Sequence, residues 1–234
     1  MKILPLAVVL VSLPLWAASP TDGVMPTKEV LAITAPAKFD VEFETTKGRF
    51  VVHSEREWAP LGVDRFYALV RCGYYDGAIL YRVGPTMSFQ GGRVVQWGLH
   101  GNPKVNAAWA NQTIKDEPAK RPHARGSLNF ARGEPNTRGV ELAIILTASP
   151  EIDTVNYMGV VGFPSIGEIT AGLEVADSFN AKYGNEPNEH SDQIAAQGSA
   201  FLDREYPGLD RIISARVREE KPKGIVAPPK PAAK

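Results

Sequence analysis

The 234-residue sequence predicts a mainly β fold, a closed antiparallel β-barrel capped by helices. Three observations indicate this. Apolar and charged side chains alternate over residues 39–44, which is typical of a strand. Helical spacing of apolar residues follows over 58–71, and helical spacing occurs again late in the chain. The 21 glycines and 19 prolines add the many turns that a β-rich fold needs.

The first predicted elements are a hairpin and a helix. Residues 39–44 (FDVEFE) have the period of a half-buried strand, 45–48 supply a turn, and 49–53 return as a second strand. Residues 58–71 then change to helical spacing, with Pro60 in the first turn, where its missing N–H costs nothing. The expected apolar face consists of Leu61, Phe66, Leu69 and Val70.

The later elements are short strands and two further helices. One helix is predicted over 173–182 and another over about 192–205, ended by Pro207 and Gly208. The expected later strands are 79–83, 126–131, 140–147, 160–163 and 212–217.

The chain divides into four predicted segments. Lys2, an apolar run to Trp16 and small residues after it are typical of a signal peptide over 1–19. Residues 20–37, rich in Pro, Thr and Ala, are predicted to be a linker, and 38–217 one domain. Residues 218–234, rich in Lys, Pro and Ala, are predicted to be a disordered tail.

Composition limits the partners, the cross-links and the metal sites that the chain can have. Lys+Arg and Asp+Glu both number 26, so no overall charge favours nucleic acid or an anionic membrane as a partner. The single cysteine, Cys72, excludes an internal disulfide. The four histidines lack i,i+3 or i,i+4 pairing, so we expect no metal and no cofactor.

Three motifs occur in order along the chain. Residues 80–92 read LYRVGPTMSFQGG, residues 126–131 read GSLNFA and are followed by PNT at 135–137, and residues 166–175 contain IGEI and GLEV. Together they resemble the cyclophilin-type peptidyl-prolyl cis-trans isomerase family over roughly residues 39–217. The piece from 190 to 217 is similar to a C-terminal extension of some bacterial members.

The resemblance implies a fold and a site. The implied fold is a closed eight-stranded antiparallel β-barrel with two capping helices, here with an extra C-terminal helical segment. The implied catalytic residues are Arg82, which serves the prolyl nitrogen, and Gln90, which hydrogen-bonds the arginine and the substrate backbone. Ala131 and Arg132 match the stretch whose backbone pairs with an extended peptide.

The chemistry of the family suits an arginine. Rotation about an Xaa–Pro bond must overcome a barrier of about 18–20 kcal/mol from amide resonance. A groove that binds the twisted amide better than either planar form lowers that barrier, and it needs no metal. An always-charged, planar donor near the prolyl nitrogen weakens the resonance further.

Several positions depart from the family pattern. Met87 and Ala143 stand where the family has two phenylalanines under the proline, and a one-residue slip would put Ile144 in the second place. Glu141 replaces a glutamine. Phe163 matches the family's histidine at best, and Phe89 and Phe163 can restore aromatic surface. Loss of a large contact at Ala143 predicts weaker proline binding.

We expect a prolyl isomerase that assists the folding of exported proteins. Its predicted partners are proline-containing peptides or unfolded exported proteins, with no nucleic acid and no membrane after signal cleavage. The predicted location is periplasmic or secreted, and the predicted state is a monomer. Two alternatives stay open: a catalytically degraded peptide-binding chaperone or scaffold, and a barrel that encloses a small apolar ligand.

Overall fold

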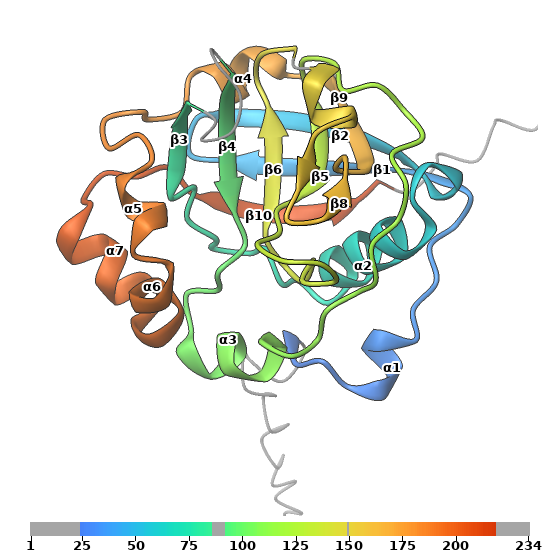
Figure 1. Ribbon diagram of the computed structural model, residues 1–234. Helices are drawn as coiled ribbons and strands as arrows, with labels where there is room; N and C mark the ends of the chain where they lie inside the picture. The colour runs from blue at the N-terminus through green and yellow to red at the C-terminus, as the bar shows by residue number, and fades with distance from the viewer. Residues whose placement is uncertain (1–23, 86–91, 149, 219–234) are drawn as a thin grey trace, which may run out of the picture.

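The computed structural model describes residues 24–85, 92–148 and 150–218, and its centre is one eight-stranded antiparallel sheet (Figure 1). The strands follow the order β10-β1-β2-β9-β5-β6-β4-β3. Their bounds are β1 Lys38–Thr45, β2 Gly48–Glu55, β3 Arg82–Pro85, β4 Arg93–Trp97, β5 Ser127–Phe130, β6 Leu142–Ile145, β9 Ser165–Ala171 and β10 Ile212–Val217. The mainly β, eight-stranded antiparallel fold is confirmed.

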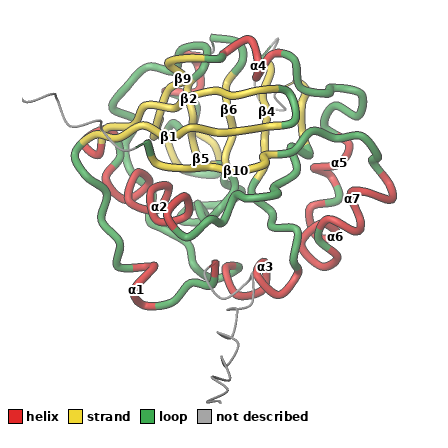
Figure 2. The backbone as a smooth tube through the Cα atoms, turned by 180° about the vertical axis from the view of Figure 1, so that it is seen from behind, coloured by secondary structure: helices red, strands yellow, loops and turns green. Residues whose placement is uncertain are grey.

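The two ends of the sheet meet through a short bridge. The sheet curls strongly, and β1, β2, β9 and β10 form the wall seen from behind (Figure 2). Ile79, just before β3, pairs with Arg211, just before β10. The Leu80 N–H donates to the Asp210 carbonyl at 2.9 Å, and the Ile212 N–H donates to the Ala78 carbonyl at 2.8 Å. Within the described ranges the terminal strands β3 and β10 do not pair with each other, so the sheet is open and strongly curled where a closed barrel was predicted.

The first hairpin forms as its alternation predicts. In β1 every second residue is buried, and Thr45 faces Gly48 across the turn. The Thr45 hydroxyl donates to the Gly48 carbonyl at 2.7 Å, and Gly48 has a φ of +130° that a side chain would strain. The buried side chains of β1 and β2 enter the barrel, where the Phe43 and Phe50 rings stack at 4.8 Å.

Side chains fill the space that the curled sheet encloses. Trp97 from β4, Leu128 from β5 and Ile144 from β6 are fully buried in the same cluster as Phe43 and Phe50. A barrel that encloses a small ligand needs a hollow interior. The packing of the described residues therefore argues against that alternative.

Two helices cover the open ends. Helix α2 (Pro60–Arg71) lies below the sheet and α4 (Leu173–Asp177) above it (Figure 1). Glu117 caps the start of α2, because its two carboxylate oxygens accept the Leu61 and Gly62 N–H groups at 2.7 and 2.9 Å. Leu61, predicted on the apolar face, is instead 43% exposed.

The late helices are shorter than the spacing predicts. Helix α4 ends at Asp177, because the Ser178 hydroxyl donates to the Val175 carbonyl and the Asn180 N–H donates to Asp210. The helix predicted over 192–205 is two helices, α6 (Ser191–Gln197) and α7 (Ser199–Glu205). They break at Gly198, whose φ is +64° and which lies against the Gly101 carbonyl. With α5 (Glu186–Glu189) and the turn residues that flank these helices they form the extra C-terminal helical segment, residues 183–206.

The segment predicted as a linker packs on the domain from residue 24 onward. Val24 and Ala35 are buried, and the Trp109 indole N–H donates to the Val24 carbonyl at 2.7 Å. The Ala35 N–H donates to the Asp64 carboxylate at 2.9 Å. The structure differs from the expectation here because backbone groups, which composition does not reveal, make these contacts. The predicted signal peptide and residues 219–234 lie outside the described residues.

The remaining elements are small. They are α1 Lys28–Leu31, η2 Arg56–Trp58, α3 Pro103–Trp109, η3 Pro150–Asp153, and a separate hairpin of β7 Asn156–Tyr157 and β8 Val160–Val161. None of the helices in the described ranges is long and apolar enough to cross a membrane.

Candidate active site

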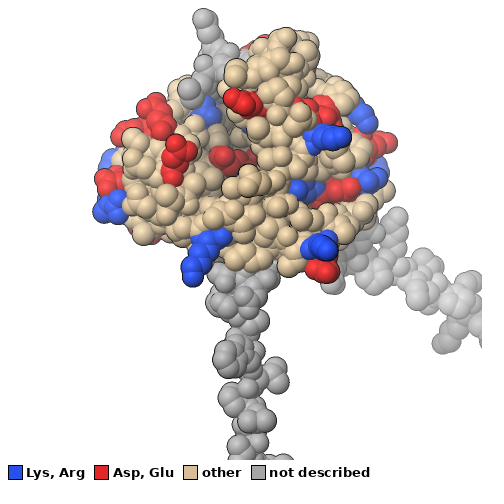
Figure 3. Space-filling model, turned by 60° about the horizontal axis from the view of Figure 1, so that its bottom comes forward, with Lys and Arg blue, Asp and Glu red and all other residues tan. Residues whose placement is uncertain are grey.

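A groove of about 850 Å³ lies across the outer face of β4, β5 and β6. Helices α3, α5 and α6 border one side of it, and the β7–β8 hairpin borders the other (Figure 1). The surface is visibly hollowed there, with acidic side chains inside the hollow and on the helical side (Figure 3). The lining includes Arg82 near one end and Arg132 near the other. We call these the Arg82 end (Arg82, Gln96 and Glu141) and the Arg132 end (Arg132, Tyr157 and Phe163).

Strand register determines which side chains reach the groove. Successive residues of a strand point to opposite faces. In β6, Leu142 and Ile144 are buried in the barrel core, whereas Ala143 and Ile145 line the groove. The predicted residue Ala143 therefore lines the groove, and Ile144 is buried in the core.

Arg82 begins β3 and lies opposite Gln96 of β4. Among the described residues, each of its three guanidinium nitrogens donates one hydrogen bond: Nε to Asn185 Oδ1 at 2.8 Å, Nη1 to Gln96 Oε1 at 2.9 Å, and Nη2 to the Pro85 carbonyl at 3.1 Å. Burial lowers the pKa of Arg82, although a guanidinium stays protonated at neutral pH. The result is a fixed, partly desolvated cation at the groove.

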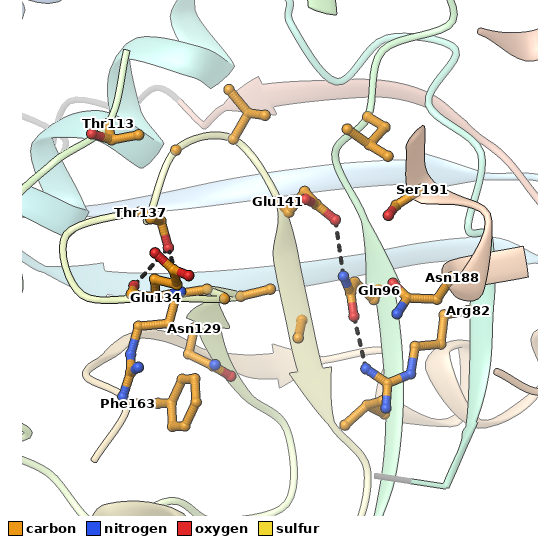
Figure 4. Close-up of a pocket in the computed structure, with 18 of the residues that line it drawn as sticks. Arg82, Gln96, Thr113, Asn129, Glu134, Thr137, Glu141, Phe163, Asn188 and Ser191 are labelled. Carbon is orange, nitrogen blue, oxygen red and sulfur yellow. Dashed lines mark hydrogen bonds between the residues drawn. The ribbon is translucent and has the colours of Figure 1, made fainter. Parts of the chain in front are cut away.

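A chain of hydrogen bonds continues from Arg82 into the sheet. Gln96 Nε2 donates to Glu141 Oε2 at 2.9 Å (Figure 4). The Tyr81 hydroxyl donates to the same oxygen. Burial, and then the nearby Glu141 charge, raise the pKa of Tyr81, so the phenol stays a donor. Among the described residues, Glu141 Oε1 has no hydrogen-bond partner. The predicted residue Glu141 therefore lies at the Arg82 end with one oxygen bound.

Arg132 is used differently. It is only 9% exposed, and its guanidinium lies 4.4 Å from the Phe163 ring. Nη1 donates to the Tyr157 carbonyl at 3.0 Å, and Nη2 donates to the Val160 and Gly162 carbonyls at 3.0 and 3.3 Å. The side chain thus binds the β7–β8 hairpin and the Gly162 carbonyl that follows it. Burial lowers the pKa of Arg132.

The other predicted site residues fall in two groups. Ala131 and Phe163 both line the groove, and their predicted roles in substrate binding stay predictions. The Ala131 N–H is already used inside the sheet, because it donates to the Glu141 carbonyl at 3.0 Å. Gln90, Met87 and Phe89 lie outside the described residues, so their predicted roles stay predictions.

Sequence reasoning missed two residues that touch Arg82. Gln96 is a buried amide inside the apolar strand Arg93–Trp97, and a lone amide in such a run was the available signal. Asn185 is separated from Arg82 by 103 positions and follows no motif. Within the described ranges, no group of three or more His, Cys, Asp or Glu side chains is placed to bind a metal ion.

Comparisons with known proteins point to one family. A model of the cyclophilin type peptidyl-prolyl cis-trans isomerase/CLD family matches residues 40–198. The chain is similar to the peptidyl-prolyl cis-trans isomerase ppi1 of Schizosaccharomyces pombe, at 29% identity over 58% of this chain and 81% of that protein. It is also similar to peptidyl-prolyl cis-trans isomerase-like 3 of Neurospora crassa, at 29% identity over 58% and 84%.

Solved structures agree at the level of the fold. A cyclophilin type peptidyl-prolyl cis-trans isomerase of Cryptosporidium parvum matches with a TM-score of 0.54 and 16% identity, over 79% of this chain and 99% of that chain. The same protein in the presence of the dipeptide Ala-Pro matches with a TM-score of 0.52, over 77% and 99%. At this identity the likeness concerns the fold.

Proposed function

The chain belongs to the cyclophilin-type peptidyl-prolyl cis-trans isomerase family, and on this premise we propose that it isomerises Xaa–Pro bonds in the groove beside Arg82. The family prediction from three ordered motifs is confirmed, and so is the enzyme class that the family name gives. The proposal concerns the finer points: the part played by Arg82, the substrates, and the place where they are met.

The arrangement of Arg82 carries the proposal. A guanidinium has five N–H groups, so Arg82 can donate to a prolyl amide while it keeps its bonds to Gln96, Asn185 and Pro85. A donor at the prolyl nitrogen stabilises the pyramidal nitrogen of the twisted amide and not the planar ground state. Only an interaction that is stronger in the transition state accelerates the reaction. Because the donor is already fixed and partly desolvated, little reorganisation is needed.

The apolar part of the groove supplies the second requirement. Val94, Ala143 and Ile145 line it beside Arg82, and Phe163 closes the far side. A proline ring placed over Ala143 loses its water there, and exclusion of water strengthens the donor's effect on the amide. The related structure in the presence of Ala-Pro makes a short prolyl peptide a reasonable first ligand to test.

We further propose that the physiological substrates are proline-containing segments of exported proteins. The support is the predicted signal peptide at residues 1–19, which would place the mature chain in the periplasm or outside the cell. N-terminal sequencing of the chain expressed in full in a bacterium tests this. A mature start near residues 18–20 supports export, and an intact Met1 contradicts it.

One observation favours a second candidate, a peptide-binding scaffold without catalysis. Ala143 offers little apolar area where the family has phenylalanine, and Glu141 adds a negative charge nearby. A groove of this kind can still bind an extended peptide. The two candidates share the groove and differ in whether Arg82 accelerates rotation.

A rate measurement separates them. The full chain should catalyse the isomerisation of an Ala-Pro-containing peptide, and a protease-coupled assay measures the rate. Arg82→Ala should lower kcat/KM about 100-fold, the cost of removing one preorganised donor from a transition state. Arg49→Ala, an exposed arginine of the first hairpin, is the matched control and should leave the rate unchanged. Peptide binding without any catalysis, unaffected by Arg82→Ala, would support the scaffold instead.

A further inference from the structure

The C-terminal helical segment contacts the strand that carries Arg82. The Val83 N–H donates to the Gly184 carbonyl at 3.3 Å. A Cβ atom added at Gly84 would lie 3.0 Å from the Gly184 backbone and 3.2 Å from Asn185 Oδ1. The glycine at position 84 is therefore what permits the two backbones to approach so closely.

This contact brings one side chain to Arg82. Asn185 Oδ1 accepts the Arg82 Nε–H at 2.8 Å, whereas Gln96 and Pro85 accept from the terminal nitrogens Nη1 and Nη2. Nε is the nitrogen nearest the aliphatic stem, so its bond restricts the rotation of the whole planar group. Gln96 and Asn185 together fix both the position and the plane of the guanidinium.

Asn185 is itself held in place. The turn around it is closed by hydrogen bonds from the Glu186 N–H to the Tyr183 carbonyl at 3.1 Å and from the Asn188 N–H to the Asn185 carbonyl at 3.0 Å. Tyr183 packs edge-on against Tyr206 of the same segment at 5.2 Å. The segment is anchored to the barrel through a buried cluster that includes Tyr81, the residue next to Arg82.

We propose that Asn185 is a positioning residue for Arg82, and that the C-terminal helical segment is thereby a required part of the active site. The inference rests on the proposed function, because it assigns Asn185 a role in that same reaction. The segment also supplies Asn188 and Ser191 to the groove wall, on the side of Arg82 (Figure 4). Loss of the Asn185 acceptor should slow the chemical step more than it weakens substrate binding.

Asn185→Leu tests the proposal, because it keeps the approximate size of the side chain and removes the acceptor. We expect kcat on the Ala-Pro peptide to fall about tenfold, as for loss of one hydrogen bond to a charged group, while KM changes less than twofold. Asn185→Asp retains an acceptor oxygen and should recover most of the rate. The Arg82 Nε–H signal in ¹⁵N NMR should exchange slowly in the native chain and in Asn185→Asp, and rapidly in Asn185→Leu.

The matched control is Gln197→Leu. Gln197 is an amide of the same segment that accepts a hydrogen bond from an arginine, Arg204 Nη2 at 3.3 Å, on an exposed surface. Its loss should leave kcat, KM and the Arg82 signal unchanged. If Asn185→Leu fails to fold, Asn185→Ser, which is too short to reach Nε, takes its place.

The failures are distinguishable. An unchanged kcat and a slowly exchanging Arg82 Nε–H in Asn185→Leu, with Arg82→Ala still inactive, would overturn the positioning role and leave the proposed function standing. Full activity of Arg82→Ala would overturn the proposed function itself. Equal losses in kcat for Asn185→Leu and Asn185→Asp, with rapid exchange in both, would also contradict the proposal.

Discussion

At one end of the groove Arg82 lies half-buried and donates to two side-chain amides and a nearby carbonyl, whereas at the other end Arg132 is almost fully buried and donates to three carbonyls of one loop. The Arg82 guanidinium is held in a fixed orientation beside the groove, whereas the Arg132 guanidinium is bound to the backbone of the hairpin region. The amide partners of Arg82 come from separate elements and hold it beside the groove. The partners of Arg132 all belong to the hairpin region that it binds.

The acceptors around an arginine in a groove determine its role. A buried cation that satisfies backbone carbonyls stabilises the loop that carries them. A cation whose partners leave donors directed to a cavity can act on a ligand. We therefore expect substitutions at the Arg132 end to act mainly on stability and those at the Arg82 end mainly on the reaction.

The largest expected effect is at Arg132. Arg132→Met keeps an apolar stem against Phe163 and removes the guanidinium, which leaves the Tyr157, Val160 and Gly162 carbonyls without this donor. The free energy of unfolding should fall by about 2–3 kcal/mol. Chemical denaturation followed by tryptophan fluorescence measures it. A 100-fold loss of isomerisation in a variant of native stability would reverse the roles of the two ends.

A smaller effect is expected for Glu141→Gln at the Arg82 end. The amide can still accept from Tyr81, while the charge near the groove is lost. Isomerisation of peptides with lysine next to proline should fall up to about fivefold, because a half-exposed ion pair contributes at most about 1 kcal/mol. Peptides with alanine at that position are the control and should change little. An equal loss on both peptides would mean that Glu141 acts through Gln96 and not through its charge.

The smallest expected effect is a dependence on pH. His100 lies in the loop after β4, its Nδ1 accepts the Asn102 N–H at 2.9 Å, and its ring contacts Tyr74. Burial lowers the pKa of His100, so the folded chain favours the neutral ring. The stability that this ring provides is complete above the ordinary histidine pKa of about 6.5 and is lost as the pH falls below it.

The measurement compares melting temperatures of the native chain and His100→Asn between pH 7.5 and pH 5. An asparagine oxygen can accept the same N–H without taking up a proton, so the variant should lose less stability on acidification. Each kcal/mol lost corresponds to about 2–4 °C in a chain of this size. An equal loss of melting temperature in the two proteins would contradict a role for His100 in the pH dependence.

The hairpin and the first helix could be predicted from sequence because their signals are local. Residues 39–44 alternate with a period that only a half-buried strand uses, and Thr45 to Gly48 close the turn. Strand β4 could not be predicted in this way. Its letters, RVVQW, form a nearly continuous apolar run with no clear period, and the buried Gln96 has a purpose only once Arg82 lies across from it.

The N-terminal segment marks another limit. Its Pro, Thr and Ala content predicted a linker, yet Trp109 and Asp64 bind its backbone. A composition rule has no access to a contact between a carbonyl and an indole far along the chain. The broken late helix has the same cause, since Gly198 leaves helical geometry where Gly101 lies against it.

By itself the sequence determined the β-rich fold, the family, and the presence of Arg82 on a strand next to a groove wall, because periodicity and short motifs are properties of neighbouring residues. Only the tertiary structure decided that Gln96 and Asn185 orient Arg82, and that Arg132 donates to backbone carbonyls of the β7–β8 hairpin. The physical reason is that a hydrogen bond depends on distance and direction, and these are set by strand register and by packing between distant segments.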